Sequence, residues 1–376
     1  MSIETAVRQF PCASCGARLE YAPGTTALTC PNCGTANQIK PEGEGGEVEE
    51  EDFLAALRSS RDSAEQHEQL VVKCGSCGSQ TTLPLHVTAM NCPFCGSSLV
   101  TQGAVHHQIK PRSLLPFWVT WEQSSQAYKG WLDGLWFAPS ALKRDAVATR
   151  LKGVYIPAWT YDCGTDSDYS GERGEDYWET ETYWDTETYT ESNGGQSVTR
   201  TRQVQKTRQV QKTRWWPASG QVQNVFDDLL VLATRSLPQK QVCGLEPWDL
   251  TNLVPYQEPY LAGFLCQSYE MDLEQGFGEA KQQMEPTIQS TICRDIGGDH
   301  QRIHQVSTAY QDITFKHLLL PVWIASYRYQ QQVYRFLVNA RTGEVQGERP
   351  WSWVKITLLI FAAISVLLLI LASVRS

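Results

Sequence analysis

The chain has 376 residues, of which 41% are hydrophobic, so it is long enough for two or three domains and at least one buried core. Its formal net charge of −9 argues against a generally basic protein that binds nucleic acid. Twelve cysteines could indicate a secreted disulfide protein, but eight of them form four Cys-x-x-Cys pairs near the N-terminus, a spacing that indicates metal binding.

The N-terminal hundred residues contain an internal repeat. The segment CASCGARLEYAPGTTALTCPNCG at 12–34 aligns without a gap with CGSCGSQTTLPLHVTAMNCPFCG at 74–96. In each copy fourteen residues separate the two cysteine pairs, which leaves room for one hairpin that brings the pairs together. A glycine follows every pair, and a residue without Cβ suits the tight turn after the second ligand.

This pattern predicts two zinc ribbons, at 10–40 and 71–100, each with one zinc ion and four thiolate ligands. Ribbon 1 would use Cys12, Cys15, Cys30 and Cys33, and ribbon 2 would use Cys74, Cys77, Cys92 and Cys95. Pairing between the copies is the alternative arrangement, and disulfides are the alternative chemistry. A zinc ion with four thiolates has no open coordination position, so such a site stabilises a fold and does not catalyse.

Residues 41–70 separate the two ribbons. The segment KPEGEGGEVEEED at 40–52 is rich in glycine and glutamate, as is typical of a solvated linker. A short helical pattern follows from Phe53 to about Leu70 and has apolar residues only at its start. We therefore predict an acidic linker with a short helix.

From 106 to 350 the composition becomes aromatic and β-prone. A Pro-x-Trp unit preceded by two bulky residues occurs three times, as LLPFW, YIPAW and LLPVW at 114–118, 155–159 and 319–323. Proline lacks a backbone donor, so each unit should open a strand or lie on a sheet edge. Helical patterns lie at 121–132, 225–236 and 271–285. We predict an α+β domain with an antiparallel sheet.

A long β-hairpin is predicted at 175–212, where an acidic segment precedes the repeated sequence RQVQKT. Asn193-Gly194 suits a two-residue type I′ turn. That turn sets the register, and the facing pairs would be Glu187–Arg200, Asp185–Arg202, Glu181–Lys206, Glu179–Arg208 and Glu175–Lys212. A slip of one residue would remove every ion pair. The basic strand is therefore expected to be neutralised within its own chain, and an arm that binds nucleic acid is the alternative.

The run ITLLIFAAISVLLLILASV at 356–374 contains no charge. As a helix it would extend about 28 Å, close to the hydrocarbon thickness of a bilayer, and Trp351 and Trp353 would lie at the interface. We predict a transmembrane helix at 354–374. Because metal-binding thiolates need a reducing compartment, the expected location is single-pass in the inner (cytoplasmic) membrane, with the N-terminal bulk facing the cytosol.

Sequence motifs for catalysis are missing from this chain. It has no phosphate loop, no nucleophile elbow and no dinucleotide-binding glycine motif, and the segment HQRIH at 300–304 has Gln301 where a metalloprotease needs glutamate. The ribbons carry few cations, with only Lys73 at 73–99, so protein docking is favoured over nucleic-acid binding. We expect a protein that is not an enzyme and has no small-molecule substrate.

The two ribbons, the segment IKPRSLLPFWVTWEQSSQAYKGWLDGLWFAPSALK at 109–143 and the terminal apolar run together resemble a bacterial family of TFIIB-type zinc-ribbon membrane proteins. Its members are often labelled primosomal protein N′ or helicase, although this chain lacks the phosphate loop a helicase needs. The resemblance implies that the eight ribbon cysteines are metal ligands. It also implies recruitment of protein partners at the membrane, among them phage-shock-type and flotillin-like proteins.

Together these features predict a non-enzymatic, tail-anchored membrane adaptor whose ribbons and α+β domain bind proteins at the cytosolic membrane face. The alternative is a membrane-tethered zinc-ribbon protein that binds nucleic acid through the basic strand. A third possibility, a hydrolase in the aromatic domain, requires a pocket with convergent polar groups.

Overall fold

The computed structural model describes residues 10–40, 48–61, 66–82, 89–95, 97–100, 104–109, 111–137, 139, 151–193, 196–329, 332–348 and 352–375. The chain divides into two compact units. The first comprises Met1–Tyr161, Asp228–Ala280 and Thr314–Ser376, and the second comprises Asp162–Asp227 and Lys281–Ile313. Their boundary falls inside four continuous elements, namely β11 (Lys152–Asn193), β12 (Gln196–Leu232), α5 (Leu273–Ile296) and β15 (His300–Tyr329).

The first unit begins with a small antiparallel sheet of three strands, β1 (Glu20–Tyr21), β2 (Ala27–Thr29) and β3 (Ala36–Gln38). Two further short elements, β4 (Glu51–Asp52) and α1 (Phe53–Arg61), follow it. The helix is shorter than the pattern at 53–70 predicted, because the chain enters strand β5 at Gln66. The Asp52 carboxylate accepts a hydrogen bond from the Ala55 N–H at 2.6 Å and so caps this helix.

Most strands of the first unit belong to one mixed sheet with the path β13-β10-β15-β11-β14-β6-β5-β9. Besides β11 and β15, the path contains β5 (Gln66–Lys73), β6 (Gln80–Thr82), β9 (Ala104–Ile109), β10 (Ser113–Leu114), β13 (Val254–Pro255) and β14 (Leu265–Gln267). Strands β16 (Gln332–Asn339) and β17 (Val345–Gly347) extend it from β15, and β7 (Ala89–Asn91) pairs separately with β8 (Ser98–Val100). The pairs β10–β15 and β11–β14 are parallel, so the sheet is not the purely antiparallel one that was predicted.

Aromatic side chains fill the core of the first unit. Phe117 stacks on Phe264 with ring centroids 4.0 Å apart, and it meets Trp323 edge-on at 5.1 Å. Trp159 is fully buried and donates a hydrogen bond to the Met271 carbonyl at 3.1 Å. The Pro-x-Trp units therefore supply core residues, but Pro157 and Pro321 lie inside β11 and β15, which are interior strands of the sheet, where strand openings or sheet edges were predicted.

Short helical elements complete the first unit. Helix α2 (Trp121–Gly134) matches the predicted helix at 121–132, and Thr120 and Gln123 form a reciprocal capping box at its N-terminus. Helix α4 (Gln239–Cys243) and two 3₁₀ turns, η1 (Leu250–Asn252) and η2 (Glu258–Leu261), connect β12 to β14. No helix forms at 225–236, because β12 continues as far as Leu232.

The predicted fold class requires correction, because the structure is mostly β-sheet, with 47% of it in strands. Strands β11, β12 and β15 have 42, 37 and 30 residues, whereas an ordinary strand has about 5–6. The predicted α+β domain, with three helices and one long hairpin at 175–212, underestimates that share, because β11 and β12 extend beyond the predicted hairpin and β15 is a third long strand. The strand pairing of β12 with β11 outweighs the helical pattern at its end.

The apolar run near the C-terminus lies in helix α6 (Trp353–Arg375). Crossing a bilayer takes a helix with about 20 consecutive, mostly apolar residues. Within the described part of the chain, no helix combines the required length with the required apolar character. The predicted transmembrane helix at 354–374 and the predicted single-pass location in an inner membrane are therefore wrong.

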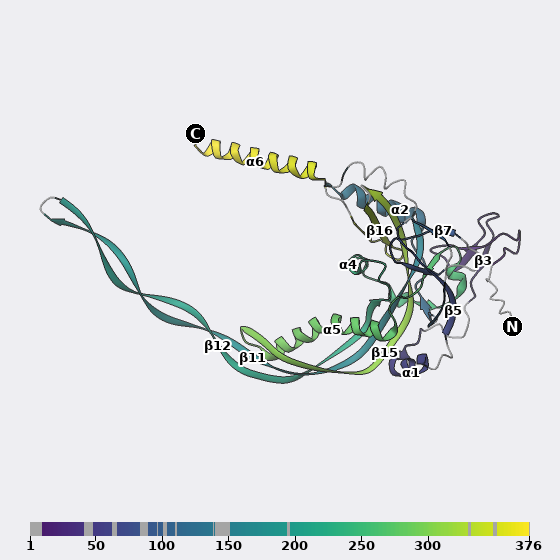
Figure 1. Ribbon diagram of the computed structural model, residues 1–376, viewed down its shortest axis with the longest axis horizontal. Coiled ribbons are helices and arrows are strands. Elements are labelled where there is room, and N and C mark those ends of the chain that lie inside the picture. The colour runs from purple at the N-terminus through teal and green to yellow at the C-terminus, as the bar shows by residue number, and fades with distance from the viewer. Residues whose placement is uncertain are drawn as a thin grey trace. The chain divides into compact units, whose positions relative to one another are not determined.

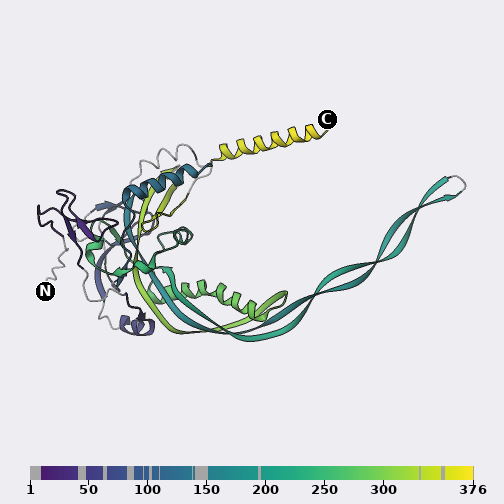
Figure 2. The same cartoon turned by 180° about the vertical axis from the view of Figure 1, so that it is seen from behind.

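In the second unit, β11 and β12 run side by side and twist around one another as a two-stranded ribbon (Figures 1 and 2). Strand β11 ends at Asn193 and β12 begins at Gln196, so Asn193 belongs to the strand and is not the first residue of a two-residue turn with Gly194. At the base of the ribbon, α5 is tied to β11 by a hydrogen bond from the Tyr169 hydroxyl to Asp295 and to β12 by one from Thr291 to Asn224.

Ion pairs join the acidic and basic strands of the ribbon, but they are displaced from the predicted ones. Arg202 pairs with Glu187 at 3.5 Å, where Asp185 was predicted to face it. Arg208 pairs with Glu181 at 3.2 Å, where Glu179 was predicted. Both contacts are displaced by two residues, which leaves every side chain on its original face.

Candidate metal centres

The Cys-x-x-Cys pairs fold into turns of one recurring geometry. Gly16, Gly34 and Gly78 have φ angles of 72°, 74° and 77°, in the left-handed region where a Cβ is strained. The N–H of each donates to the carbonyl of the first cysteine in its own pair, at 2.8–2.9 Å. The fourth such glycine, Gly96, lies outside the described residues. The glycine after each described pair is therefore required by the backbone turn.

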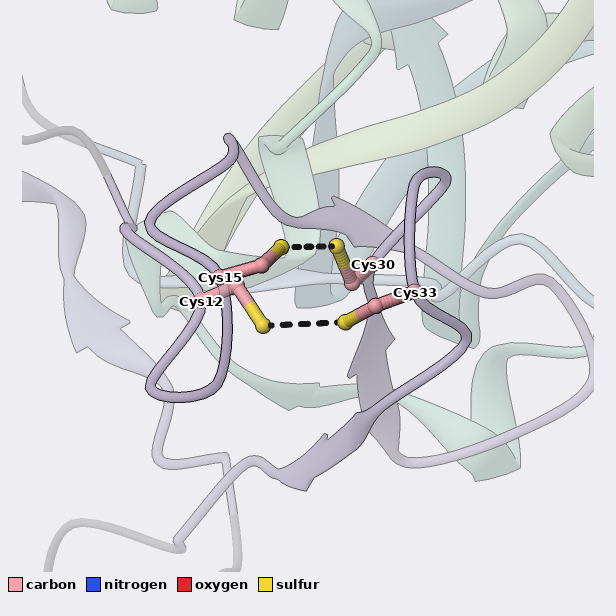
Figure 3. Close-up of side chains that lie close together, drawn as sticks. All are labelled: Cys12, Cys15, Cys30 and Cys33. Carbon is pink, nitrogen blue, oxygen red and sulfur yellow. Dashed lines mark hydrogen bonds between the residues drawn. The ribbon is translucent and has the colours of Figure 1, made fainter.

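The first centre brings together the four predicted cysteines of ribbon 1 (Figure 3). The Sγ atoms of Cys12 and Cys33 are 3.5 Å apart, as are those of Cys15 and Cys30. All four sulfurs lie within 4.8 Å of one another. Four sulfurs at about 2.3 Å from a tetrahedral ion would be about 3.8 Å apart, so the cluster fits such an ion.

The second centre repeats this arrangement in ribbon 2. The sulfurs of Cys74 and Cys95 are 3.6 Å apart, and those of Cys77 and Cys92 are 3.7 Å apart, again within a cluster of 4.8 Å. A disulfide would bring two sulfurs to about 2.05 Å, and all these cysteines are free thiols. The distances between the sulfurs are therefore too long for disulfides. Each cluster contains the cysteines of one copy of the repeat, so the two copies do not share a cluster.

Ribbon 1 packs on the aromatic core of the first unit. Tyr21 lies edge-on to Tyr260 with ring centroids 5.2 Å apart, and its backbone N–H donates to the Ala262 carbonyl at 2.9 Å. The Gly24 N–H donates to the Phe117 carbonyl at 3.0 Å. The outer ligands Cys15 and Cys33 remain exposed. The first centre is thus attached to the core on one side and faces solvent on the other.

Ribbon 2 is built into the large sheet. Strand β6, which begins three residues after Cys77, pairs with both β5 and β14. Cys92 and Phe94 are fully buried in the second hydrophobic core cluster of this unit. Arg335 donates to the Phe94 carbonyl at 2.9 Å from strand β16. The second centre is therefore enclosed by the fold.

A half-buried carboxylate, Glu270, supports the second centre from a distant part of the sequence. Glu270 accepts a hydrogen bond from the Gln80 N–H at 3.1 Å, directly after the first cysteine turn of ribbon 2. It also accepts from the Arg235 N–H at 2.8 Å and from the Ser236 hydroxyl at 2.5 Å. The sequence patterns gave no signal for this residue, because its partners come together only in the folded sheet.

Hydroxyl groups next to the sulfurs were also missed at the sequence level. Ser79 lies 3.2 Å from the sulfur of Cys77 and 3.3 Å from that of Cys92, and Ser97 lies 3.2 Å from Cys74 and 3.0 Å from Cys95. Each serine directly follows the glycine of its turn, a position that the alignment of the two copies could have identified. In ribbon 1 the equivalent residues are Ala17 and Thr35, so the first centre has one such hydroxyl.

These contacts change the acidity of the thiols. The Thr35 hydroxyl and N–H lower the pKa of Cys33 to about 6. Burial opposes ionisation of Cys74, but hydrogen bonds from the Ser97 hydroxyl and nearby N–H groups lower its pKa to about 6. Burial raises the pKa of Cys92 to about 12. A metal ion that needs four thiolates must displace the protons that remain, so binding is coupled to proton release.

The other four cysteines lie outside both centres. Cys163 is buried, Cys266 and Cys293 are half-buried, and Cys243 is exposed. Cys163 lies 3.7 Å from the Met284 sulfur inside the second unit. Among the described residues, the groups that could hold a metal ion are the two four-cysteine clusters.

The chain is 23% identical over 353 residues to the uncharacterized protein YdjG of Bacillus subtilis (strain 168), a match that covers 91% of this chain and 90% of the relative. No family model matches the chain. No solved structure matches it either. The relative's name states no activity. The resemblance to TFIIB-type zinc-ribbon proteins remains a prediction.

Proposed function

We propose that this protein is a non-enzymatic adaptor that binds other proteins, and that each four-cysteine centre holds one structural zinc ion. The observation that carries the proposal is that both centres are closed sets of four sulfurs packed on or in the core of the first unit. A zinc ion there has no free coordination position, so its contribution is to the stability of the fold. Thiolate ligands with this spacing favour zinc over harder cations.

The hydrolase alternative requires a pocket with convergent polar groups, and the first unit contains a cavity to compare with that requirement. It has a volume of about 650 Å³, with Trp121, Phe264 and Trp323 among its walls and Glu20, Glu122 and Lys152 among its polar residues. Its lining residues include no serine, cysteine or histidine. The Tyr21 hydroxyl donates to the Thr25 carbonyl, and the Thr120 hydroxyl accepts from the Gln123 N–H. The hydroxyls of Tyr21 and Thr120 are therefore engaged in structural hydrogen bonds, which disfavours a hydrolase that uses a hydroxyl or thiol nucleophile at this cavity.

The two-stranded ribbon of β11 and β12 contains the basic strand that the nucleic-acid alternative requires. Lys206 lies 2.9 Å from Asp185 and 3.0 Å from Glu187, and Lys212 lies 2.7 Å from Glu179 and 2.8 Å from Glu181. Cations that are neutralised in this way release few counterions from a phosphate backbone, so they contribute little to nucleic-acid affinity. This pattern favours a protein partner. Phage-shock-type and flotillin-like proteins, implied by the family resemblance, are the first candidates we propose.

Two measurements test the proposal. Elemental analysis of the purified chain should find two zinc ions per molecule. Binding assays at physiological salt should show that the chain binds a purified candidate partner and does not bind DNA or RNA. The variant R202E/R208E/R214E separates the alternatives, because a nucleic-acid binder would lose its affinity while it stays folded. Nucleic-acid binding by the wild-type chain that this variant abolishes would overturn the adaptor proposal. A chain without stoichiometric zinc would overturn the assignment of the metal.

A further inference from the structure

The ribbon of the second unit separates its residues by charge. Strand β11 carries the repeat YWETET-YWDTET at 177–188, and β12 carries RQVQKT twice at 202–213. Side chains alternate between the two faces of a strand. One face, here called the charged face, therefore carries all the acidic and basic residues of these repeats. The other, the uncharged face, carries Trp178, Thr180, Thr182, Trp184, Thr186, Thr188 and Thr190 from β11 and Thr199, Thr201, Gln203, Gln205, Thr207, Gln209 and Gln211 from β12.

The acidic and basic side chains of the charged face pair with one another within one chain. Besides the ion pairs, Arg202 lies over the Tyr189 ring at 5.5 Å and Arg208 lies over the Tyr183 ring at 5.5 Å. Arg214 lies over the Tyr177 ring at 4.9 Å. These contacts cover part of the face, and its aliphatic residues Val204 and Val210 are half-buried between them. This face therefore has little unsatisfied charge to offer a partner.

The uncharged face is open to solvent. Each of its fourteen residues is exposed, and the rings of Trp178 and Trp184 are 67% and 66% exposed. The Gln209 amide donates to the Thr180 hydroxyl at 2.9 Å across the two strands, but this contact covers neither ring. Exposed tryptophans that recur at a fixed spacing on a folded surface indicate an interaction site.

The chemistry of the uncharged face suits a second copy of itself. Its glutamine and threonine side chains each carry both a donor and an acceptor, so a copy related by a two-fold axis can pair with it. The ionised groups of the two repeats lie on the charged face. Asp176, at the base of the uncharged face, already accepts hydrogen bonds from Gln211 and Thr213, so such a contact would remove no unpaired ion from water. A nucleic acid, by contrast, needs cations, and this face has none.

The twist of the ribbon also favours a second copy. Figures 1 and 2 show β11 and β12 winding repeatedly around one another, so the uncharged face turns continuously along the ribbon. A straight partner, such as an α-helix or an extended sugar chain, would meet one tryptophan and then lose contact. A second ribbon has the same twist and can follow the face by coiling about a shared axis.

The size of the face predicts the strength of the contact. About thirteen residues at about 3.3 Å each, on two strands about 4.8 Å apart, give a flat area of roughly 400 Å². Stable complexes bury about 800 Å² on each partner, and smaller interfaces are weak and transient. We propose that two copies of this chain associate reversibly, with the uncharged faces of their β11–β12 ribbons in contact and the two ribbons coiled around a shared axis. This self-association is independent of the proposed function, since it requires neither zinc nor another protein.

Sedimentation velocity of the full chain from about 1 µM to about 200 µM, a range suited to a small interface, tests the proposal. The wild-type protein should shift from monomer to dimer as its concentration rises. The variants T182E/T186E/T207E and T182K/T186K/T207K should each dimerise at least about tenfold more weakly, because like charges then meet. A mixture of the two variants should recover the dimer, measured as energy transfer between differently labelled chains.

The matched control is Q282E/Q283E/S290E, which adds the same three charges to exposed positions of α5 in the same unit. It should dimerise as the wild-type protein does, and circular dichroism should show that all variants keep their strands. A wild-type chain that stays monomeric throughout the range overturns the proposal. So does a glutamate variant that dimerises normally, or a mixture that fails to recover. Zinc content and partner binding are measured separately, so their failure would leave this result interpretable.

Discussion

The two candidate metal centres share one spacing of cysteines and differ in their surroundings. In the first, Cys15 and Cys33 are exposed, and Asn32 donates to the Cys15 sulfur at 3.8 Å from an exposed position. In the second, the residue aligned with Asn32 is Phe94, which is fully buried. One local turn geometry therefore serves both a surface site and a core site. The difference arises from the residues between and after the cysteines, and it should be visible in stability and in metal exchange.

The largest expected effect is the loss of a ligand from the buried centre. Cys92 is itself fully buried, and Cys92→Ser leaves three sulfurs and a hydroxyl around the ion, so we expect the free energy of unfolding to fall by about 4 kcal/mol or more. Cys33→Ser, at the exposed centre, should cost clearly less, because water can reach the site and ribbon 1 keeps its contacts with the core. Denaturant unfolding with zinc analysis compares the two, and equal costs would contradict the distinction between the centres.

Metal removal should also separate the centres. A chelator reaches the exposed sulfurs of the first centre directly, whereas the second must first open locally. We expect the first zinc ion to leave at least about tenfold faster than the second, which corresponds to about 1.4 kcal/mol of opening free energy. A chromogenic zinc chelator records the two phases, and Cys33→Ser should abolish the fast one. A single phase that releases both ions would argue against the comparison.

The grouping of the eight cysteines into two clusters could be predicted from the sequence, because Cys-x-x-Cys-Gly encodes a local turn. Their different burial could not, because the contacts of ribbon 2 with Glu270 and Arg335 depend on residues about 190 and 240 positions away. A partial signal existed in Asn32 and Phe94, since a polar and an aromatic residue at the same repeat position indicate different surroundings.

The long strands show a similar limit. The pattern at 225–236 is compatible with a helix, and only the pairing of β12 with β11 extends the strand to Leu232. In the ribbon, acids and bases recur at every second or fourth residue, so a displacement of two residues still brings opposite charges together. The charge pattern therefore fixes which residues share a face but does not choose between the two registers.

Substitutions that remove or add a hydroxyl next to the cysteine sulfurs test how much these hydroxyls contribute to the stability of each centre. Ser79 is fully buried and lies near two sulfurs, so Ser79→Ala should lower the stability of the zinc-bound protein by about 1.5 kcal/mol. The reciprocal change, Ala17→Ser, places a hydroxyl at the aligned position of the first centre and should slow its metal release. Chelator kinetics on both variants measure this directly. If Ala17→Ser has no effect while Ser79→Ala accelerates release, burial of the site matters more than the number of hydroxyls.

The smallest expected difference between the two centres is in the cost of adding a Cβ to the turn glycine, which should be the same in both. Gly16 and Gly78 have φ angles of 72° and 77°, and a Cβ on either would have no atom within 4 Å, so only backbone strain distinguishes alanine from glycine there. Gly16→Ala and Gly78→Ala should each cost about 1–2 kcal/mol. Gly75→Ala is the control, since it lies in the same turn as Gly78, without a positive φ and with open space around its Cβ. Equal costs at Gly16 and Gly78, measured by denaturant unfolding, would place the difference between the centres in their surroundings. A much larger cost at Gly78 would mean that the buried turn is itself more tightly constrained than the exposed one.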